Sequence, residues 1–439
     1  LNLFFEASGL AISKMKSSIF FCNTNSGTRR VIIRTTQFQE DTLPIKYLGL
    51  PLITKRLSKH DCAPFIERIL ARANSRVSKS LSYAGRLQLI KFTLASMQVF
   101  WCSSFMLPAS VIKECERILR RFLWGGSSNA VKQSLVKWAK VCTPCQEGGL
   151  GVKNLTTWNT TLLLKQVWNL LIDHSLWMQW CKMYLIRKHS FWILPIRGLH
   201  SWAWRQILNL RSTALMHLLY VICRGNEFSL WYDPWFHVAS IHALYGHGVI
   251  HDAGMVGNEK GQDAIVSNQW CWPETTWELR EIKQSVRDIP ITNSPDKIFW
   301  GSIGQVFSTH KAWQAIRPQY AKVNWFHLVW HPNRIPKQAF CLCLSILGAH
   351  RTRNKLMPLG IVDTDECVFN CGDKENVAHL FFACPYSSYI WSRVLNLCSI
   401  YKYPLPWLEE IQWMVEHSKG KQLLHRLRKV AFGAAIYHI

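Results

Sequence analysis

The chain has 439 residues, which is enough for two or three domains with their own hydrophobic cores. Its hydrophobic content of 49% and its charged content of 18% exclude an intrinsically disordered protein. The 52 Lys and Arg residues outnumber the 27 Asp and Glu residues, and the formal net charge is +25. This charge favours a polyanionic partner, most commonly nucleic acid, and a basic surface without a binding role is the alternative.

The 15 cysteines are scattered along the chain, and no signal-peptide pattern precedes them. This pattern predicts free thiols in a reducing compartment, the nucleus or the cytoplasm, and not a secreted protein. The sequence begins with Leu1 and not with Met, and we expect a fragment of a longer reading frame.

Residues 1–57 alternate short apolar runs with turn residues. Residues 18–22 and 30–34 are predicted strands, separated by a polar turn at residues 23–28. Residues 47–51 form another short extended piece, and Pro51 excludes it from the middle of a sheet.

From Ser58 to about residue 185 the apolar residues recur with a helical period. We expect Ser58 to cap a helix that runs to Ser75, and Ser82 to cap a second helix that ends near Leu107. The second helix and the start of the next lie in residues 92–112, a run without charge that is long enough to span a bilayer. Its polar residues and Pro108 favour a buried helix instead, so no membrane contact is expected.

A third helix is predicted after Pro108, and it has two distinct faces. One basic stripe consists of Lys113, Arg117, Arg120 and Arg121. Such a stripe can follow the phosphates of a nucleic acid, and an ordinary solvated face is the alternative. The apolar stripe predicted to face the core consists of Val111, Ile112, Cys115, Ile118, Leu119, Phe122 and Leu123.

The remaining segments are predicted to differ in secondary structure. Residues 158–184 form a fourth helix that is apolar nearly all round, residues 186–295 a Trp-rich connector, and residues 299–308 a short hairpin. The tail from residue 420 to 439 is predicted to be an amphipathic helix. We assign Leu423, Leu424, Leu427 and Val430 to its apolar face, and Lys421, His425, Arg428 and Lys429 to its basic face.

The residues that most specifically indicate chemistry are Cys367, Cys371, His379 and Cys384, with the spacing C-x3-C-x7-H-x4-C. Thiolates and imidazole are the ligands of structural Zn²⁺, so this cluster predicts a zinc site. The alternative is that these cysteines are small buried hydrophobic residues. Two other cysteine pairs are not expected to bind metal: Cys142 and Cys145 lack a second pair at zinc-finger distance, and Cys341 and Cys343 lie in an apolar run.

Several motifs, taken together, resemble the C-terminal half of the open reading frame of plant LINE-type (non-LTR) retrotransposons. They follow the order of that family and cover nearly the whole chain. The motifs are Ser8-Gly-Leu, Lys16-Ser-Ser-Ile-Phe-Phe21, Leu43-Pro, Tyr47-Leu-Gly-Leu-Pro-Leu52, Leu81-Ser-Tyr-Ala-Gly-Arg-Leu-Gln-Leu-Ile-Lys91, Arg120-Arg-Phe-Leu-Trp-Gly-Gly126, Glu147-Gly-Gly-Leu-Gly151, Leu230-Trp-Tyr-Asp-Pro-Trp235, Val329-Trp, Ile335-Pro-Lys337 and His379-Leu-Phe-Phe-Ala-Cys384-Pro.

The resemblance implies a zinc-binding domain of the kind that follows reverse transcriptase, with the four ligands named above. It also implies that Lys16 is the lysine near the nucleotide and that Tyr47-Leu-Gly49 is the turn that grips the primer end. The family usually has C-x2-C where this chain has Cys367-x3-Cys371, and Asn where it has Ser13.

The same resemblance implies that catalytic residues are missing. Reverse transcriptases hold two Mg²⁺ ions with aspartates that include an adjacent pair, and this chain contains no Asp-Asp pair. Mg²⁺ is therefore expected only if an upstream palm were present. Asp233 lies in Trp231-Tyr-Asp-Pro-Trp235, which predicts a packing turn and not a metal site.

We therefore expect a mainly α-helical, multi-domain fragment of a reverse transcriptase that binds zinc and nucleic acid, RNA or an RNA/DNA duplex, but has no polymerase site. The alternatives are the C-terminal half of an active enzyme whose palm lies upstream, and a protein-interaction or structural remnant.

The expected domains are a palm tip with a small β remnant (1–57), a thumb-like helical domain (58–185), the connector (186–295), the zinc-binding domain (296–400) and a basic tail (401–439). Expected nucleic-acid contacts, besides Lys16, Tyr47 and Gly49, are Lys79, Arg86, Lys91, Lys113, Arg117, Arg120 and Arg121.

Overall fold

The computed structural model describes residues 2–9, 13–42, 45–53, 55–75, 80–125, 134–172, 175–187, 189–198, 200–420 and 422–439. The described chain is mainly helical, with four small two-stranded sheets among the described residues, so the expected fold class is confirmed. None of the helices in these ranges is both long and apolar enough to cross a lipid bilayer.

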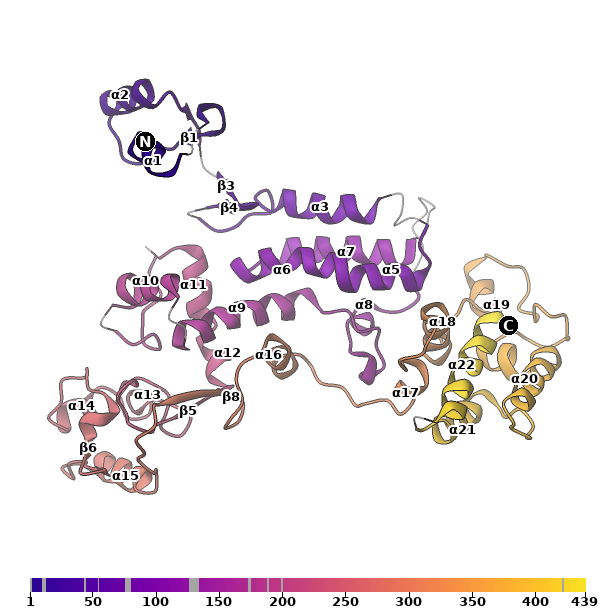
Figure 1. The fold of residues 1–439 in the computed structure, drawn as a ribbon. Helices are drawn as coiled ribbons and strands as arrows, with labels where there is room; N and C mark the ends of the chain where they lie inside the picture. Colours follow the sequence, from indigo (N-terminus) through magenta and orange to yellow (C-terminus); the bar gives the residue numbers. More distant parts are fainter. Residues whose placement is uncertain are drawn as a thin grey trace.

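The N-terminal residues form a small unit that stands apart from the helical layers (Figure 1). It contains α1 (Asn2–Ser8), α2 (Ser26–Thr36) and the short strands β1 (Ser18–Ile19) and β2 (Gln39–Glu40), which pair in parallel. The strand predicted at residues 30–34 is wrong, because these residues lie inside α2. The Asn25 side chain accepts a hydrogen bond from the Thr28 amide and caps this helix, which outweighs the β-branched run that suggested a strand.

A tight hairpin follows, made of β3 (Ile45–Tyr47) and β4 (Leu50–Leu52). Its two turn residues, Leu48 and Gly49, both have positive φ angles, of 50° and 84°. This is the φ pattern of a type I′ turn, which matches the twist of the paired strands. The extended piece predicted at residues 47–51 is thus wrong at Leu48 and Gly49, which form a hairpin turn, as the resemblance implied for Tyr47-Leu-Gly49.

The helical layers are built from α3, α5, α6, α7 and α9, which lie close together in Figure 1. The predicted cap at Ser82 is confirmed, because its hydroxyl accepts a hydrogen bond from the Gly85 amide. The predicted cap at Ser58 is wrong: α3 begins at Ala63, and Ser58 instead bonds the Asp61 carboxylate in the preceding turn. The bounds are α3 (Ala63–Ala73), α5 (Tyr83–Leu89), a π-helical turn (Ile90–Leu94), α6 (Ala95–Ser104), α7 (Ala109–Gly125), α8 (Trp138–Val141) and α9 (Leu155–Ile172).

The predicted helix at residues 158–184 is divided in the structure. Helix α9 ends at Ile172, and α10 (Leu176–Trp180) starts a new segment that continues into a π-helical turn (Cys181–Ile186). The expected buried character of α9 is confirmed, because ten of its residues are buried.

Residues 186–316 form a mixed region with its own hydrophobic core, which also includes the C-terminal half of α9. Strand β5 (Leu218–Val221) pairs antiparallel with β8 (Lys297–Trp300). The strand partner predicted for the hairpin at residues 299–308 is therefore wrong, because β8 pairs with β5. A turn does follow β8, closed by a hydrogen bond from the Trp300 amide to the Gln305 carbonyl, but the residues after it form no strand. The other elements are α11 (Trp202–Asn209), α12 (Arg211–Leu215), α13 (Ile241–Tyr245), α14 (Gly248–Asp252), β6 (Ile265–Val266), β7 (Gln269–Trp270), α15 (Trp277–Val286) and α16 (Thr309–Ile316).

Two carboxylates, one buried and one partly buried, organise the loops of this mixed region. Asp296 accepts hydrogen bonds from the backbone amides of Cys223, Gly225 and Glu227. Asp233 accepts one from the Ser229 amide, and burial raises its pKa to about 6. The predicted packing turn at residues 231–235 is confirmed, since Trp231 and Trp235 are both buried beside Asp233.

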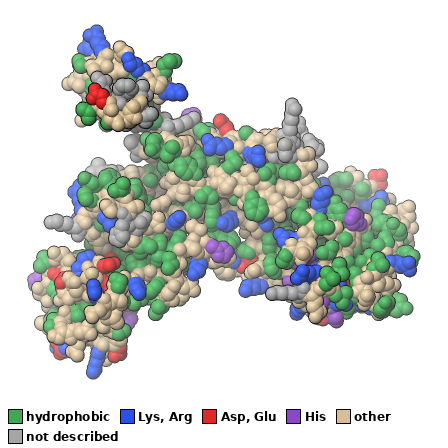
Figure 2. Space-filling model, in the orientation of Figure 1, with side chains coloured by type: hydrophobic (Ala, Val, Ile, Leu, Met, Phe, Trp, Pro, Cys, Tyr) green, Lys and Arg blue, Asp and Glu red, His purple; other side chains and the backbone are tan. Residues whose placement is uncertain are grey.

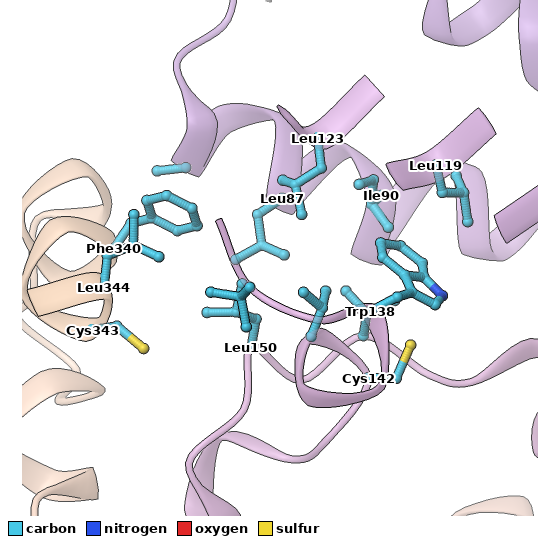
Figure 3. Close-up of a cluster of buried hydrophobic side chains, with 14 of the residues drawn as sticks. Leu87, Ile90, Leu119, Leu123, Trp138, Cys142, Leu150, Phe340, Cys343 and Leu344 are labelled. Carbon is cyan, nitrogen blue, oxygen red and sulfur yellow. The ribbon is translucent and has the colours of Figure 1, made fainter. Parts of the chain in front are cut away.

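The C-terminal part gathers at one end of the molecule, beside the C-terminus (Figure 1). Helix α18 (Pro336–Ile346) of this part packs against α5 of the helical layers. Figure 3 shows Phe340 and Leu344 of α18 pointing toward Leu87 and Leu123 of α5 and α7. The remaining elements are α17 (Phe326–Val329), α19 (Arg353–Leu356), a π-helical turn (His379–Ala383), α20 (Pro385–Leu397), α21 (Trp407–His417) and α22 (Leu423–His438).

The amphipathic tail helix is confirmed as α22, but the predicted faces are wrong. Leu423 and Leu427 are exposed, whereas Phe432 and Ile436 are buried and Lys429 is buried with them. The buried face is set by the elements that pack against α22, which are α18 and, at Phe432, the rings of Phe382 and Trp391. Sequence periodicity could not identify those partners.

A buried ion pair joins the helical layers to the C-terminal part. The Arg317 guanidinium donates two hydrogen bonds to the Glu147 carboxylate, one of them at 2.7 Å, and both side chains are less than a tenth exposed. Glu147 also accepts a hydrogen bond from the Tyr320 amide, and Val323 donates to the Gln146 carbonyl. The loop at residues 145–151 is thereby tied to the segment that leads into α17.

We expect Glu147→Gln to lower the free energy of unfolding by about 3–5 kcal/mol, because it leaves the Arg317 guanidinium buried without its counter-charge. Urea unfolding at pH 7, followed by tryptophan fluorescence, measures this loss. The matched control is Glu274→Gln, which removes the same charge from an exposed pair with Lys283 and should change stability much less. A loss no greater than that of the control would contradict the prediction.

The same pair predicts a pH dependence. The hydrogen bond from Arg317 holds the pKa of Glu147 below its ordinary value of 4.5, although burial opposes this. A carboxyl group whose pKa falls on folding contributes stability that is present above the unfolded pKa and is lost as pH falls through the folded pKa. The stability difference between wild type and Glu147→Gln should therefore narrow below about pH 4.5. A difference that stays constant down to pH 3 would contradict this reasoning.

Candidate metal centre and nucleic-acid surface

The structure brings together the four residues predicted as zinc ligands. One potential ligand atom from each of Cys367, Cys371, His379 and Cys384 lies within 4.8 Å of all the others. The Cys367 and Cys384 sulfurs are 3.9 Å apart, and the Cys371 sulfur lies 3.1 Å from His379 Nε2. Two thiolates at the corners of a tetrahedron with Zn–S bonds of about 2.3 Å would be about 3.8 Å apart. The donor set and its spacing thus fit a tetrahedral zinc ion.

The first two cysteines lie on a compact loop. The Cys367 amide donates to the Asp373 carbonyl, and the Asn370 amide donates back to the Cys367 carbonyl, so the chain folds over itself between the two sulfurs. Asn370 and Gly372 have positive φ angles, of 52° and 89°. Asn370 lies between the two cysteines, so its left-handed backbone turns the chain within the Cys367-x3-Cys371 spacing, and Gly372 turns it again after Cys371.

A buried carboxylate holds this loop against the rest of the domain. Glu375 accepts hydrogen bonds from the Val368 amide, within the loop, and from the Arg353 amide, at the start of α19. On the same loop, the exposed carboxylate of Asp373 has its Oδ2 3.9 Å from His379 Nδ1. The other ring nitrogen, Nε2, lies 3.1 Å from the Cys371 sulfur and therefore faces the cysteines.

The other two ligands lie on either side of a helix start. His379 begins a π-helical turn, and Cys384 is the N-cap residue of α20. Although burial opposes it, the backbone amides of Tyr386 and Ser387 hold the pKa of the Cys384 thiol below its ordinary value. A helix N-terminus therefore favours the thiolate, which is the form that binds a metal.

Cys367 has the opposite electrostatic environment. Burial raises the pKa of its thiol to about 11, and its neighbours Cys371 and Cys384 add to the effect. Two thiolates cannot be held 3.9 Å apart in a buried site without a positive charge between them. A divalent cation would supply that charge and allow all three cysteines to ionise.

One cysteine of each of the two other pairs is buried, and the other, Cys145 or Cys341, is partly buried. Cys142 and Cys343 are buried, and burial raises the pKa of both thiols to about 12. Neither belongs to the metal-ligand cluster found in the described residues. They contribute to the hydrophobic core, where Figure 3 shows both side chains.

The basic stripe of the third predicted helix lies on the outer face of α7. Lys113, Arg117, Arg120 and Arg121 are all exposed, while the apolar stripe faces inward, with Phe122 only half-buried. Arg117 donates two hydrogen bonds to Glu114, which holds the pKa of that carboxyl below its ordinary value. The stripe therefore carries three cations and one partly neutralised arginine.

The remaining predicted contact residues are dispersed. Lys16 is exposed on a 3-10 turn in the N-terminal unit, and Tyr47 is exposed beside Gly49 at the hairpin tip. Lys79 lies outside the described residues. None of these positions lies on α7, so the structure does not bring all predicted contacts into one stripe.

Two predicted contact residues point inward. Arg86 is buried, with its guanidinium 5.7 Å from the Tyr83 ring and 6.0 Å from the Phe122 ring. Lys91 is half-buried, its ammonium 5.7 Å from the Trp330 ring, and burial lowers its pKa. Neither side chain lies on the outer face of α7, and helical spacing alone could not show this.

The face of the molecule drawn in Figure 2 is predominantly basic. On the face shown in Figure 2, blue Lys and Arg side chains are spread over all parts of the molecule, while red Asp and Glu side chains are few. This distribution matches the net charge of +25. Long-range attraction of a polyanion would therefore not depend on α7 alone.

Comparison with known proteins supports the assignment of the Cys and His cluster as a candidate zinc site. Residues 307–391 match the family described as zinc-binding in reverse transcriptase. The chain is 30% identical over 365 residues to a protein of Arabidopsis thaliana named "Putative ribonuclease H protein", a match that covers 79% of this chain and 58% of the relative. It is 28% identical over 142 residues to an uncharacterized mitochondrial protein of the same plant, covering 32% of this chain and 92% of that relative.

The chain spans little more than half the length of the first of these relatives. The family match includes His379 and Cys384 and the loop that carries Cys367 and Cys371. The resemblance to plant retrotransposon reverse transcriptases is thus confirmed, and residues 307–391 match the domain described as zinc-binding in reverse transcriptase.

Proposed function

We propose that the chain is a fragment of a retrotransposon reverse transcriptase that binds one structural Zn²⁺ and binds nucleic acid, without polymerising it. The observation that carries the zinc assignment is the convergence of four ligand atoms within 4.8 Å inside a match to a zinc-binding family. The ion would be held by Cys367, Cys371, His379 and Cys384. It would supply the cross-link that fixes the loop against α20.

Purified protein should contain one Zn²⁺ per chain by native mass spectrometry. Cys371→Ser should lose the metal and lower the melting temperature, because a structural zinc ion contributes directly to folding. The control is Cys271→Ser, which changes an exposed cysteine outside the cluster and should retain one zinc. Metal-free wild-type protein, or a Cys371→Ser protein with undiminished zinc, would refute the assignment.

Nucleic-acid binding is proposed for the outer face of α7, through backbone phosphates and with little sequence preference. The support is the exposed stripe of Lys113, Arg117, Arg120 and Arg121 on a chain of charge +25. Phosphate contacts displace bound counterions from the nucleic acid, so the affinity should fall steeply with salt. The preferred substrate is proposed to be RNA or an RNA/DNA duplex.

The triple variant Arg117→Glu, Arg120→Glu, Arg121→Glu should weaken duplex binding equally for unrelated sequences. On duplex DNA the salt slope should decrease by about 2.7, since each lost phosphate contact accounts for about 0.9. The control reverses three exposed cations elsewhere, Arg287, Lys297 and Lys311, and has the same net charge. Equal weakening by both triple variants would assign binding to net charge and not to α7.

We also propose that this chain alone does not polymerise DNA. Two-metal chemistry needs carboxylates that hold both Mg²⁺ ions about 3.5–4 Å apart. The sequence has no adjacent aspartates, and Glu40 and Asp41 are exposed at the end of β2. The second candidate, the C-terminal half of an active polymerase, is favoured by the retained hairpin at Tyr47-Leu-Gly49.

Primer extension on poly(A)–oligo(dT) with Mg²⁺ or Mn²⁺ should give no incorporation above a control without protein. Template-dependent incorporation by this polypeptide would show that catalytic carboxylates have been misassigned. Incorporation that appears only after an upstream palm segment is added would favour the second candidate.

A further inference from the structure

A small cavity lies where α17, α18 and α22 meet in the C-terminal part of the chain. Its volume of about 10 Å³ is enough for one water-sized group. Its polar lining consists of His331, Arg334, Gln338 and Lys429, and among the described residues that line it none is Asp or Glu. The cavity therefore has cations and hydrogen-bond donors in its wall, and no carboxylate to balance them.

Lys429, in the middle of α22, brings a buried positive charge to this cavity. The residue is only 8% exposed, and its ammonium forms no hydrogen bond or ion pair with the part of the chain that the structure describes. Burial lowers the pKa of this ammonium. A buried ammonium without a counter-charge is costly, so the fold either keeps Lys429 neutral or supplies an anion beside it.

His331, between α17 and α18, also lines the cavity. It is 8% exposed, and its Nδ1 is buried without a hydrogen-bond partner. Burial lowers its pKa to about 4, and the positive charges of Lys429 and Arg334 add to this effect. The imidazole is therefore neutral at pH 7, and the tautomer protonated on Nδ1 has an N–H that is free to donate to a ligand.

The first turn of α18 adds backbone donors to the same cavity, which is lined by Ile335, Gln338 and Ala339. The Ala339 amide donates to the Ile335 carbonyl, whereas the amides before it in this turn have no carbonyl partner within the helix. The N-terminus of a helix carries a partial positive charge. All three sides of the cavity thus favour a negatively charged ligand.

Arg334 is the third cationic side chain of the cavity, and it is already engaged. Its guanidinium donates a hydrogen bond to the His331 carbonyl and lies 5.9 Å from the Trp330 ring. Arg334 therefore adds positive potential, while the groups free to contact a ligand are the Lys429 ammonium and the His331 imidazole.

We infer that this cavity binds one monatomic anion, such as chloride, between Lys429, His331 and the first turn of α18. The small volume excludes phosphate and sulfate, in which four oxygens surround a central atom, and it equally excludes a phosphate of nucleic acid. A water molecule fits the same volume but does not offset the charge of Lys429. The anion joins α22 to the start of α18, and this role is independent of zinc binding and of nucleic-acid binding.

The direct test is a crystal of the full-length wild-type chain grown in sodium bromide, with diffraction data collected at the bromine absorption edge. We expect an anomalous peak in the cavity, between the Lys429 ammonium and the His331 imidazole. A cavity that is empty or holds only water under these conditions would overturn the inference.

A solution test compares the melting temperature in sodium chloride, sodium bromide and sodium gluconate at one ionic strength and pH 7.5. A ligand that binds only the folded state raises the melting temperature by mass action. At a halide concentration of about ten times the dissociation constant, the wild type should melt about 3 °C higher than in gluconate, which is too large for the cavity.

Lys429→Met removes the charge and keeps an unbranched apolar side chain, so this variant should melt at the same temperature in all three salts. The matched control is Lys419→Met, which removes the same charge from an exposed site in the same part of the chain and should keep the halide effect. Equal halide dependence of the wild type and both variants would assign the effect to the basic surface and overturn the inference. The bromide peak decides the question by itself if Lys429→Met does not fold.

Discussion

The structure depends on the covering of the N-terminal helices by α18, a helix about 250 residues further along the chain than α5. Helices α5 and α7 each present an apolar face, and Phe340 and Leu344 complete the layer above Leu87 and Leu123 (Figure 3). Hydrophobic burial supplies most of the driving force for such a contact. The buried Glu147–Arg317 pair restricts the position of the C-terminal part relative to the helical layers, because a bidentate ion pair tolerates little displacement.

This arrangement links the candidate metal centre to the helices that carry the basic stripe. The residues near the centre, Phe381 and Phe382, belong to the same buried cluster as Leu119 and Leu123 of α7. The side chains between them form one contiguous core, and close packing transmits strain through such a core. A zinc ion that fixes the loop at residues 367–371 would therefore also stabilise the surface on which α18, α20 and α22 rest.

Residues 163–312 contain a second hydrophobic core, separate from that of the helical layers. Helix α9 contributes to both cores, with Leu162 in the first and Leu163 in the second. The Trp-rich region is thus a packed body with its own carboxylates, Asp233 and Asp296, which accept backbone hydrogen bonds in its loops. Because α9 packs into both cores, a rotation of one core relative to the other would have to displace residues of this helix.

The sequence by itself determined the properties that depend on local order. Ligand type and spacing predicted which four residues converge in the candidate metal centre, because Cys367 and Cys384 are close enough in sequence for one loop and one helix start to bring them together. Helical periodicity identified the two faces of α7, and Ser82 marked the start of α5. In each case the deciding interaction lies within a few turns of the chain.

The tertiary structure decided what depends on distant partners. The faces of α22 were misassigned because α18 covers Lys429, Phe382 and Trp391 cover Phe432, and Leu423 and Leu427 stay exposed. The partner of β8 is β5, about 80 residues earlier, and the inward direction of Arg86 follows from Tyr83, Phe122 and α18. Periodicity shows that a face is apolar, but only the position of another element shows which face is covered, because burial depends on what packs against the helix and not on the helix alone.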